Sequence, residues 1–363
     1  MVKVDDIYKY IDNFAPFNTA MDFDNCGMLI CDKDSIVERV MLCLDVTDSV
    51  IYEAININAN LIISHHPVIF KPIKNIQNDS IVYKLIENKI NVICAHTNLD
   101  MSSILGVNTC LADALELSSL SPLSIYKSTS YNKIIVYSPS ESSDLIRRKM
   151  SEAGAGELGN YSNCSFTFSG EGRFTPMNNA NPYIGKINEC ETVCEDCIQM
   201  ICKKSDTYKV IKAMKSVHPY EVPAFDIFED LALRDDTVLG LIGSTKKEFS
   251  FDEFALYVKE KLNANGARYL KGANKINRVA VSSGAGGNLI EQAINLNADA
   301  FVTGEIKHHE LLQAQKHNIT VVDVGHFASE DVVILPLLKK LSDNFKNIEF
   351  IKAKSLKDFL FYI

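Results

Sequence analysis

The sequence predicts an α/β protein: a domain that contains a parallel β-sheet and is interrupted by an inserted α+β domain of the ferredoxin-like type. Near both ends of the chain, short aliphatic runs alternate with amphipathic helical patterns, which is typical of βαβ units. The middle of the chain follows another order: strand, helix, two strands, helix and strand, as in a ferredoxin-like unit. Histidines and carboxylates also follow several predicted strands, where α/β sheets bind ligands.

The α/β domain is predicted from two separate stretches, 1–126 and 236–363. In the first, aliphatic runs at 40–45, 60–64 and 90–95 alternate with the helical patterns DSVIYEAI and SIVYKLIEN. In the second, the same rhythm appears in INRVAVSSG, NLIEQAINLN, DAFVTG, HHELLQAQKHN and ITVVDVG. The shared rhythm indicates that both stretches belong to one architecture.

The inserted domain is predicted over 127–235. Its strands are expected at YNKIIVYSP, SNCSFTFSG, ETVCEDCIQM and VPAFDIFED, and its helices at ESSDLIRRKMSEAG and SDTYKVIKAMKSVH. We expect this segment to leave the α/β domain through one surface loop and to return to the same place.

Composition narrows the classes of partner. The chain has 363 residues, of which 47% are hydrophobic and 23% charged, enough for a sizeable core. A net charge of -9 without a basic block disfavours nucleic acid as a partner and favours a small molecule or a protein. No signal peptide or uncharged run of membrane length is visible, so we expect a cytoplasmic protein. The ten cysteines lie mostly in aliphatic runs and are expected to be reduced and buried.

Three predicted strands are followed by residue types that commonly bind metal ions. LIISHHPVIF ends a buried strand in two histidines, HTNLD has a His-x-x-x-Asp spacing, and GHFASE has a His-x-x-x-Glu spacing. Strand ends meet at one edge of a parallel sheet, so we expect these side chains to converge. The residues concerned are His65, His66, His96, Asp100, His326 and Glu330.

Imidazoles and carboxylates without thiolates suit zinc, iron, manganese, nickel or cobalt. The set is large enough for two divalent ions, with one carboxylate as the bridge. Each of the three motifs also has a simpler interpretation: an exposed turn for the histidine pair, a hydrogen-bonded loop for His96 and Asp100, and a helix cap for His326 and Glu330. All three features lie at equivalent strand ends, which favours the metal site.

Other motifs give weaker signals. The SGAGG stretch at 283–287 has two interpretations, a tight strand-to-helix turn and a phosphate cradle, and the turn is favoured because the Walker lysine is missing. The cysteines at 190, 194, 197 and 202 match no strong metal-binding spacing. His308 and His309 lie in a helical pattern, and His309 is a candidate for a residue that supports a metal ligand.

Together, ISHHPVIF, AHTNLD, TGEIKHHE and GHFASE resemble the Nif-three-like dinuclear-metal proteins, also named GTP cyclohydrolase I type 2 homologues. Supporting stretches are DNCGMLI, LDVT, LGLIG and RVAVSSGAG, so the resemblance covers essentially the whole chain. In the middle segment, GAGELGNYSNCSF, GEGRFTP and HPYEVPAFDI are similar to the PII-like or cation-tolerance-like insert of the longer bacterial members.

The resemblance implies a set of metal ligands, with Glu330 as the bridge and His96 close by. The implied ligands are His65, His66, Asp100, His326 and Glu330. It also implies a toroidal homohexamer built from trimers, with the metal sites facing an internal cavity.

The leading functional hypothesis is a dinuclear-metal-dependent hydrolase. Two ions lower the pKa of a bound water and make hydroxide available near neutral pH. The resemblance alone suggests GTP or a related nucleotide as the substrate, and His96 is the candidate catalytic residue for proton transfer. The alternative is a non-catalytic metal-binding regulatory protein whose PII-like insert senses a small ligand. An open coordination position on each ion would favour the enzyme.

Overall fold

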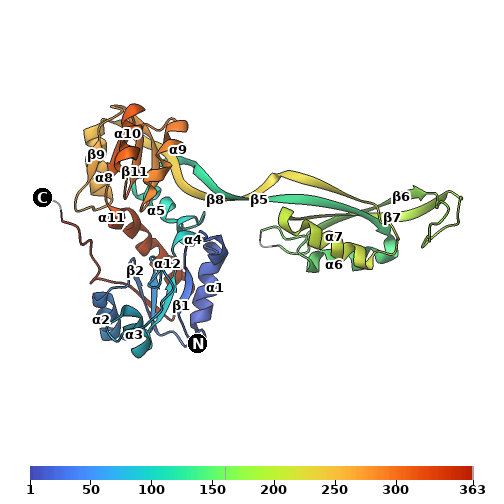
Figure 1. Ribbon diagram of the computed structural model, residues 1–363, viewed down its shortest axis with the longest axis horizontal. Helices are drawn as coiled ribbons and strands as arrows, with labels where there is room; N and C mark the ends of the chain where they lie inside the picture. Colours follow the sequence, from blue (N-terminus) through green and yellow to red (C-terminus); the bar gives the residue numbers. More distant parts are fainter. Residues whose placement is uncertain (160, 362–363) are drawn as a thin grey trace. The chain divides into compact units, whose positions relative to one another are not determined.

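The computed structural model describes residues 1–159 and 161–361, and the chain forms two compact units. One unit consists of residues 1–126 and 237–363, and the other of residues 127–236 (Figure 1). The first unit is a mixed α/β structure with both parallel and antiparallel strand pairs, so the predicted α/β class is confirmed at this level. It contains two separate sheets.

The first sheet has the strand order β1-β4-β3-β2-β13. Its central strands β2, β3 and β4 are parallel, β13 joins them in parallel, and β1 is antiparallel to β4. The strand β13 comes from the end of the chain, so the C-terminal segment completes the N-terminal sheet. The bounds are β1 (Gly27–Ile30), β2 (Arg39–Cys43), β3 (Leu61–Ser64), β4 (Asn91–Cys94) and β13 (Glu349–Lys352).

Helices cover both faces of this sheet. The buried side chains of α1 and α12 pack on one face and those of α2 and α3 on the other. Ile7 and Ile11 are four residues apart in α1 and fully buried, as expected for the inner stripe of an amphipathic helix. Truncating either to alanine should cost about 2–5 kcal/mol of stability. The bounds are α1 (Val4–Phe14), α2 (Asp48–Asn56), α3 (Ile81–Glu87) and α12 (Ile334–Asn344).

The second sheet repeats this three-layer plan. Within the unit its order is β5-β8-β10-β11-β12-β9, where β5 (Ser118–Pro139) and β8 (Phe225–Phe249) each lie partly in this unit. The strands β10, β11 and β12 are parallel, and β8 and β9 are antiparallel to β10 and β12. Helices α5 and α8 cover one face, and α9 and α10 cover the other. The bounds are α5 (Val107–Ala114), α8 (Phe251–Lys261), β9 (Arg268–Leu270), β10 (Ile276–Ser282), α9 (Ile290–Asn295), β11 (Ala300–Thr303), α10 (His308–Lys316) and β12 (Thr320–Asp323).

The unit of residues 127–236 follows the element order strand, helix, strand, strand, helix, strand. Its strands β6, β7 and β5 are antiparallel, and helices α6 and α7 pack on one face through a small core of Ile, Val and Met side chains. The bounds are β5 (Ser118–Pro139), α6 (Ser140–Glu152), β6 (Ser165–Phe174), β7 (Glu191–Lys203), α7 (Thr207–Val217) and β8 (Phe225–Phe249).

The expectation that the chain enters this unit through a surface loop is wrong. The chain passes from one unit to the other along two continuous strands, β5 of 22 residues and β8 of 25 residues. Sequence patterns missed these extensions because the stretch LSIYKSTSYN is largely polar and exposed, which removes the apolar alternation that marks a half-buried strand.

All ten cysteines lie among the described residues and are unpaired, but only five are buried, so the expected burial is wrong for the other five. The cysteine series in and beside β7 does not converge: Cys194 and Cys197 are three positions apart in an extended strand, so their side chains point to opposite faces. Over residues 1–159 and 161–361, the chain has no helix that is long and apolar enough to cross a membrane.

Candidate metal centre

The histidine pair leaves the end of β3. The ladder between β2 and β3 continues past the strand, because the His65 N–H donates to the Cys43 carbonyl at 3.0 Å and the His66 N–H to the Leu44 carbonyl at 2.9 Å. The Ser64 hydroxyl donates to the His66 carbonyl at 2.8 Å and fixes the turn. Both imidazoles therefore stand at the carboxyl edge of the sheet, with their ring centroids 5.0 Å apart.

His96 and Asp100 are held by the next strand end. His96 precedes the single-turn helix α4 (Thr97–Asp100), whose start is anchored by a carboxylate from the N-terminal segment. Asp24 accepts from the Thr97 N–H at 3.1 Å and from the Thr97 hydroxyl at 2.5 Å. Residues four apart lie on one side of a helical turn, so His96 and Asp100 face the same side. On that side, Asp100 Oδ1 lies 3.6 Å from His65 Nε2.

His326 and Glu330 come from the other sheet, through the short helix α11 (His326–Glu330) that follows β12. Glu330 is only 4% exposed. Its Oε2 lies 3.0 Å from His66 Nε2, 3.1 Å from His326 Nε2 and 3.8 Å from His65 Nε2. The Glu330 carboxylate therefore lies between histidines of both sheets, within ion-pairing distance of three rings.

Each of the four imidazoles is fixed through its Nδ1 atom. The acceptors lie 2.7 to 2.9 Å from Nδ1 and are the Ala95 carbonyl for His65, Asp45 for His66, Asp24 for His96 and Glu305 for His326. These oxygens can only accept, so Nδ1 carries the proton and Nε2 is left for the centre of the cluster. Histidine ligands in metalloproteins are oriented in this way.

The donor atoms of the cluster fit a metal ion. Buried polar side-chain atoms normally have hydrogen-bond partners. Among residues 1–159 and 161–361, His65 Nε2 and Asp100 Oδ1 are buried without a hydrogen-bond partner, and Glu330 Oε2 faces only the Nε2 atoms of the cluster histidines. Two sets of three ligand atoms lie within 4.8 Å of one another: His65, His66 and His96, and His66, His326 and Glu330. The donor set and its unsatisfied atoms therefore suit a cation.

The charges within the cluster also favour a cation. Burial would lower the pKa of His66, but the contacts with Asp45 and Glu330 outweigh it and raise this pKa to about 10. For His326, burial is outweighed by Glu330 and Glu305, and the pKa rises to about 9. Burial would raise the pKa of Glu330, but the histidines hold it well below its usual range. Without a metal, these histidines hold protons that balance the carboxylates.

The SGAGG loop packs against this cluster. Gly284 has a φ of 56°, and a Cβ there would lie 2.2 Å from Glu330 Oε1 and 3.3 Å from His326 Nε2. Its N–H donates to the Ser329 hydroxyl, the Ser283 N–H to Asn108 Oδ1, and the Gly287 N–H to the Glu305 carbonyl. Because these donors are occupied within the protein, the structure supports the tight turn over the phosphate cradle.

Sequence reasoning missed the residues that orient the histidines. Asp45 lies two residues beyond β2 and Glu305 two residues beyond β11, and a carboxylate near a strand end was a usable signal for both. Asp24 lies in a loop and gives no such signal. The supporting role suggested for His309 is wrong, because its side chain is 71% exposed on α10 and Glu305 holds His326 instead.

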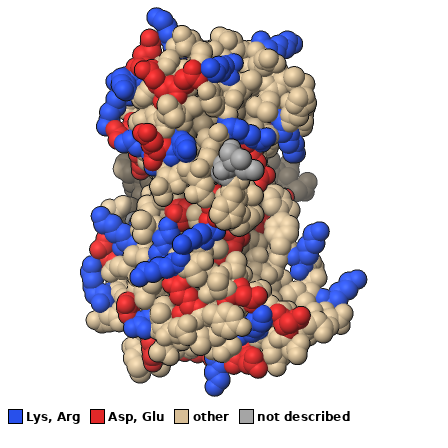
Figure 2. Space-filling model, turned by 90° about the vertical axis from the view of Figure 1, so that its left-hand side faces the viewer, with Lys and Arg blue, Asp and Glu red and all other residues tan. Residues whose placement is uncertain are grey.

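A cavity of about 800 Å³ opens beside His326. Its lining includes Glu305, Arg268, Lys307 and the glycine-rich loop. Arg268 is engaged by the Asp323 carboxylate at 2.7 Å, whereas Lys307 is exposed. On the face drawn in Figure 2, Lys and Arg side chains are scattered among Asp and Glu and form no continuous basic stripe. The cavity is large enough for a small-molecule ligand.

Comparisons with known proteins agree on one family. The family model described as Duf34/NIF3 (NGG1p interacting factor 3) matches residues 2–358. A Staphylococcus aureus protein named GTP cyclohydrolase 1 type 2 homolog is 37% identical over 354 residues, which cover 96% of this chain and 95% of the relative. A Staphylococcus epidermidis protein of the same name is 37% identical over 331 residues, 90% of both chains.

Solved structures agree with the sequence matches. A Bacillus cereus protein described as related to NIF3 has a TM-score of 0.77 and 33% identity, with 100% of this chain and 99% of that chain covered. A Staphylococcus aureus protein of known crystal structure has a TM-score of 0.82 and 32% identity, with the same coverage. With its two sheets, its histidine and carboxylate cluster and these matches, the chain belongs to the Duf34/NIF3 family.

Proposed function

We propose that this protein is a dinuclear-metal-dependent hydrolase. The observation that carries the proposal is the central position of Glu330 Oε2, within 3.8 Å of the Nε2 atoms of three histidines whose Nδ1 atoms are each fixed by an acceptor. Such an arrangement holds ligands for a cation from two separate sheets. One imidazole nitrogen binds one ion, so two ions per chain require the Asp100 carboxylate, 3.6 Å from His65, and a Glu330 carboxylate that bridges the ions.

The proposed ligands are Glu330, the three histidines within 3.8 Å of its carboxylate, and Asp100, which lies 3.6 Å from His65. They are His65, His66, Asp100, His326 and Glu330, with Glu330 as the bridge. Oxygen and imidazole donors without thiolates suit zinc, iron, manganese, nickel or cobalt. Bound divalent ions would lower the pKa of a water molecule and so supply a nucleophile near neutral pH.

His96 is proposed as the residue that moves a proton. Its ring lies 5.2 Å from that of His65 and 5.5 Å from that of His66 between centroids, and Asp24 fixes its Nδ1. Unlike the other three histidines, it has no described ion-pair contact with Glu330 among residues 1–159 and 161–361. This offset from the carboxylate favours an acid–base role near the ions over a role as ligand.

GTP or a related nucleotide is the proposed substrate class. The names of the relatives suggest it, and the cavity of about 800 Å³ beside His326 has room for a molecule of that size. Lys307, which lines this cavity and is exposed, offers a charge for an anionic group.

The test is metal content together with hydrolysis. The protein is purified without added metal or chelator, metal per chain is measured by elemental analysis, and nucleotides, phosphoesters and small amides are screened for hydrolysis. The double variant His65→Ala, Glu330→Gln should lose both metal and hydrolysis. His309→Ala, a variant of an exposed histidine outside the cluster, should retain both. Metal-free protein after loading, or hydrolysis that survives in the double variant, would refute the proposal.

The second candidate is a regulatory metal-binding protein in which residues 127–236 sense a ligand. A cavity of about 540 Å³ in this unit favours it. The strand and helix order of the unit supports a PII-like, ferredoxin-like insert. A metal-loaded protein whose ions accept no exchangeable water or anion would favour this candidate over the enzyme. We further propose that the chain assembles as a homohexamer, which sedimentation of the purified protein tests.

A further inference from the structure

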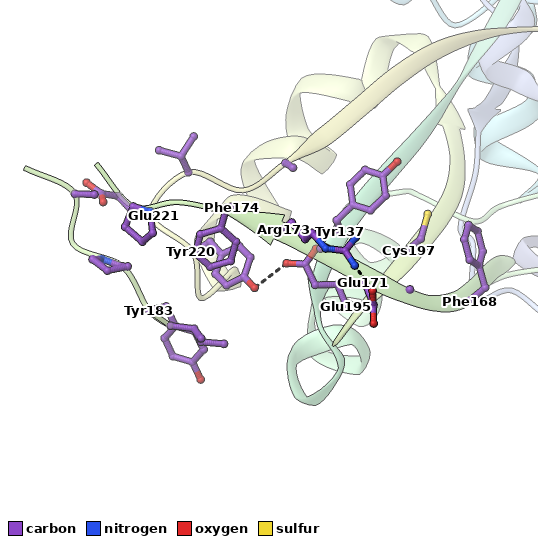
Figure 3. Close-up of a pocket in the computed structure, with 18 residues that line it drawn as sticks. Tyr137, Phe168, Glu171, Arg173, Phe174, Tyr183, Glu195, Cys197, Tyr220 and Glu221 are labelled. Carbon is purple, nitrogen blue, oxygen red and sulfur yellow. Dashed lines mark hydrogen bonds and ion pairs between the residues drawn. The ribbon is translucent and has the colours of Figure 1, made fainter. Parts of the chain in front are cut away.

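The unit of residues 127–236 contains a cavity of about 540 Å³, which is within the usual range for small-molecule sites (Figure 3). The cavity lies on the face of the sheet opposite helices α6 and α7. Along β7, Ile198 and Met200 point into the helix-covered core, so the alternation of a strand turns Glu195 and Cys197 to the other face. The floor of the cavity is therefore a sheet face without helices.

The strand register explains how this floor is built. Cys197 is paired with Tyr137 of β5 on one side and with Phe168 of β6 on the other, so these three side chains form a row across the sheet. Glu195, two positions earlier, is paired with Gly170. The Glu195 carboxylate lies over Gly172 of the same strand β6, whose lack of a side chain leaves room for it.

Aromatic rings form one wall of the cavity. Tyr220 packs against Phe174 with ring centroids 5.9 Å apart and against Tyr183 at 6.3 Å. Figure 3 shows Phe174 and Tyr220 together, with the Tyr220 hydroxyl directed at the Glu195 carboxylate and Tyr183 farther from that carboxylate. The hydroxyl donates to Glu195 Oε1 at 2.7 Å. Ring faces attract cations, most strongly where water is excluded.

The charged residues in the lining leave an excess of negative charge. Arg173 is paired with Glu171 at 2.5 Å, so these two neutralise each other. Glu195 and Glu221 remain, and Glu221 Oε2 accepts only a neutral donor, the Asn181 N–H at 3.0 Å. Within the described lining, two carboxylates beside three aromatic rings thus face the cavity without a cationic partner.

We propose that this cavity is a binding site for a small organic cation, an amine or quaternary ammonium group attached to an apolar body. The cation would contact the rings of Tyr220, Phe174 and Tyr183 and lie near the Glu195 carboxylate, and the apolar body would lie along the row of Tyr137, Cys197 and Phe168. This proposal is independent of the metal centre and of its hydrolytic function.

Gly172 offers a way to test the position of the carboxylate. A Cβ at Gly172 would lie 2.1 Å from Glu195 Oε2 and 2.4 Å from its Cδ, both atoms at the end of a flexible side chain. The Gly172→Ala variant should therefore move the carboxylate while keeping its charge and leaving the strand intact. Glu195→Gln does the reverse, because it removes the charge and retains an acceptor for Tyr220.

The experiment compares choline with 3,3-dimethylbutan-1-ol, a neutral molecule of nearly the same shape, by ligand-observed nuclear magnetic resonance on the full-length protein. Choline should bind saturably and at least about tenfold more tightly than the alcohol, a difference of about 1.4 kcal/mol. Glu195→Gln and Gly172→Ala should each abolish most of this preference. Glu152→Gln and Tyr208→Phe, which alter exposed residues outside the cavity, should retain it.

Three outcomes would overturn the proposal. These are equal binding of choline and the alcohol, no saturable binding of choline, and a choline preference that survives in both Glu195→Gln and Gly172→Ala. Adenosine and phenylacetate serve as further probes. Binding of adenosine without choline would make the cavity a nucleobase site, and binding of phenylacetate without choline would make it an anion site, so each would also contradict the proposal.

Discussion

His66 Nε2 lies 3.0 Å from Glu330 Oε2, although His66 follows a strand of the first sheet and Glu330 ends a helix that follows the second. The contact joins the two sheets at their carboxyl edges. His66 is also shared by both sets of ligand atoms. A change at either residue should therefore affect the whole centre, whereas a change at an outer ligand should affect part of it.

Replacing Glu330 with glutamine should remove both metal ions, because the neutral amide loses the charge that faces three imidazoles. His65→Ala should mainly remove one ion. Elemental analysis after metal loading measures both, with Glu291→Gln, an exposed position in α9, as the control. Equal and small losses from the first two variants would argue against Glu330 as the bridge.

Replacing Gly284 with alanine should lower metal content, because the added Cβ would lie 2.2 Å from Glu330 Oε1. Gly159→Ala is a matched control: Gly159 has the same φ of 56°, but apart from its chain neighbours no atom of the described residues lies within 4 Å of its added Cβ. Both variants carry the backbone strain of a left-handed alanine, about 1–2 kcal/mol. Equal metal content in the two variants would show that Gly284 does not shape the centre.

Metal binding should release protons. In the metal-free protein the pKa values of His66 and His326 are raised to about 10 and about 9, so both rings are charged at pH 7.5 and must lose a proton to become ligands. Burial would lower the pKa of His65, but Asp100 and Glu330 outweigh it and raise this pKa as well. Titration calorimetry in buffers of different ionisation enthalpy should therefore give at least roughly two protons released per chain. The apparent affinity should rise with pH up to about 9–10. An affinity independent of pH between 6 and 9 would contradict this account.

The same shifts affect the stability of the metal-free protein. A raised folded-state pKa stabilises the fold fully below the unfolded value of about 6.5, and this contribution is lost as pH rises through the folded value. The metal-free protein should therefore lose stability as the pH rises from about 7 to 10. Denaturant unfolding of chelator-treated protein measures this, and His66→Ala should flatten the dependence.

His96→Ala should leave metal content near normal and reduce any hydrolysis by at least roughly tenfold, because a positioned acid–base group typically contributes this much or more. Asp24→Asn should have a related but smaller effect, since Asp24 holds His96 Nδ1 at 2.9 Å. A loss of metal in His96→Ala as large as that in His65→Ala would make His96 a ligand. No change in either quantity would make it a loop histidine.

Deleting residues 127–236 and joining the flanks with a short Gly-Ser linker should leave a folded, metal-binding α/β unit. All members of the histidine and carboxylate cluster and all of the first sheet lie outside this segment, and the second sheet loses only the parts of β5 and β8 that extend into it. Circular dichroism and elemental analysis of the deletion protein test this. Aggregation together with loss of metal would show that the segment is part of the fold of the other unit.

The sequence predicted the parts of the centre that depend on local pattern. Histidines after buried strands and the four-residue spacings of His96 with Asp100 and His326 with Glu330 were visible without coordinates, because each reflects a strand end or one helical turn. The α/β class followed from the alternating apolar runs in the same way.

The remaining features depend on contacts between distant segments. Asp24 reaches His96 from a loop, and β13 joins the first sheet from the far end of the chain, so neither has a periodic signal. The role of Gly284 depends on the approach of Glu330, which follows from how the two sheets pack. The long strands β5 and β8 were missed because exposed polar residues hide their alternation.

Anomalous diffraction from crystals of metal-loaded protein tests the central claim most directly, because it locates the ions without assuming an activity. The account predicts two peaks per chain, about 3.5 Å apart, on either side of the Glu330 carboxylate and within reach of His65, His66 and His326. A metal-loaded crystal with no peak at this cluster, or with peaks only elsewhere on the chain, would contradict it.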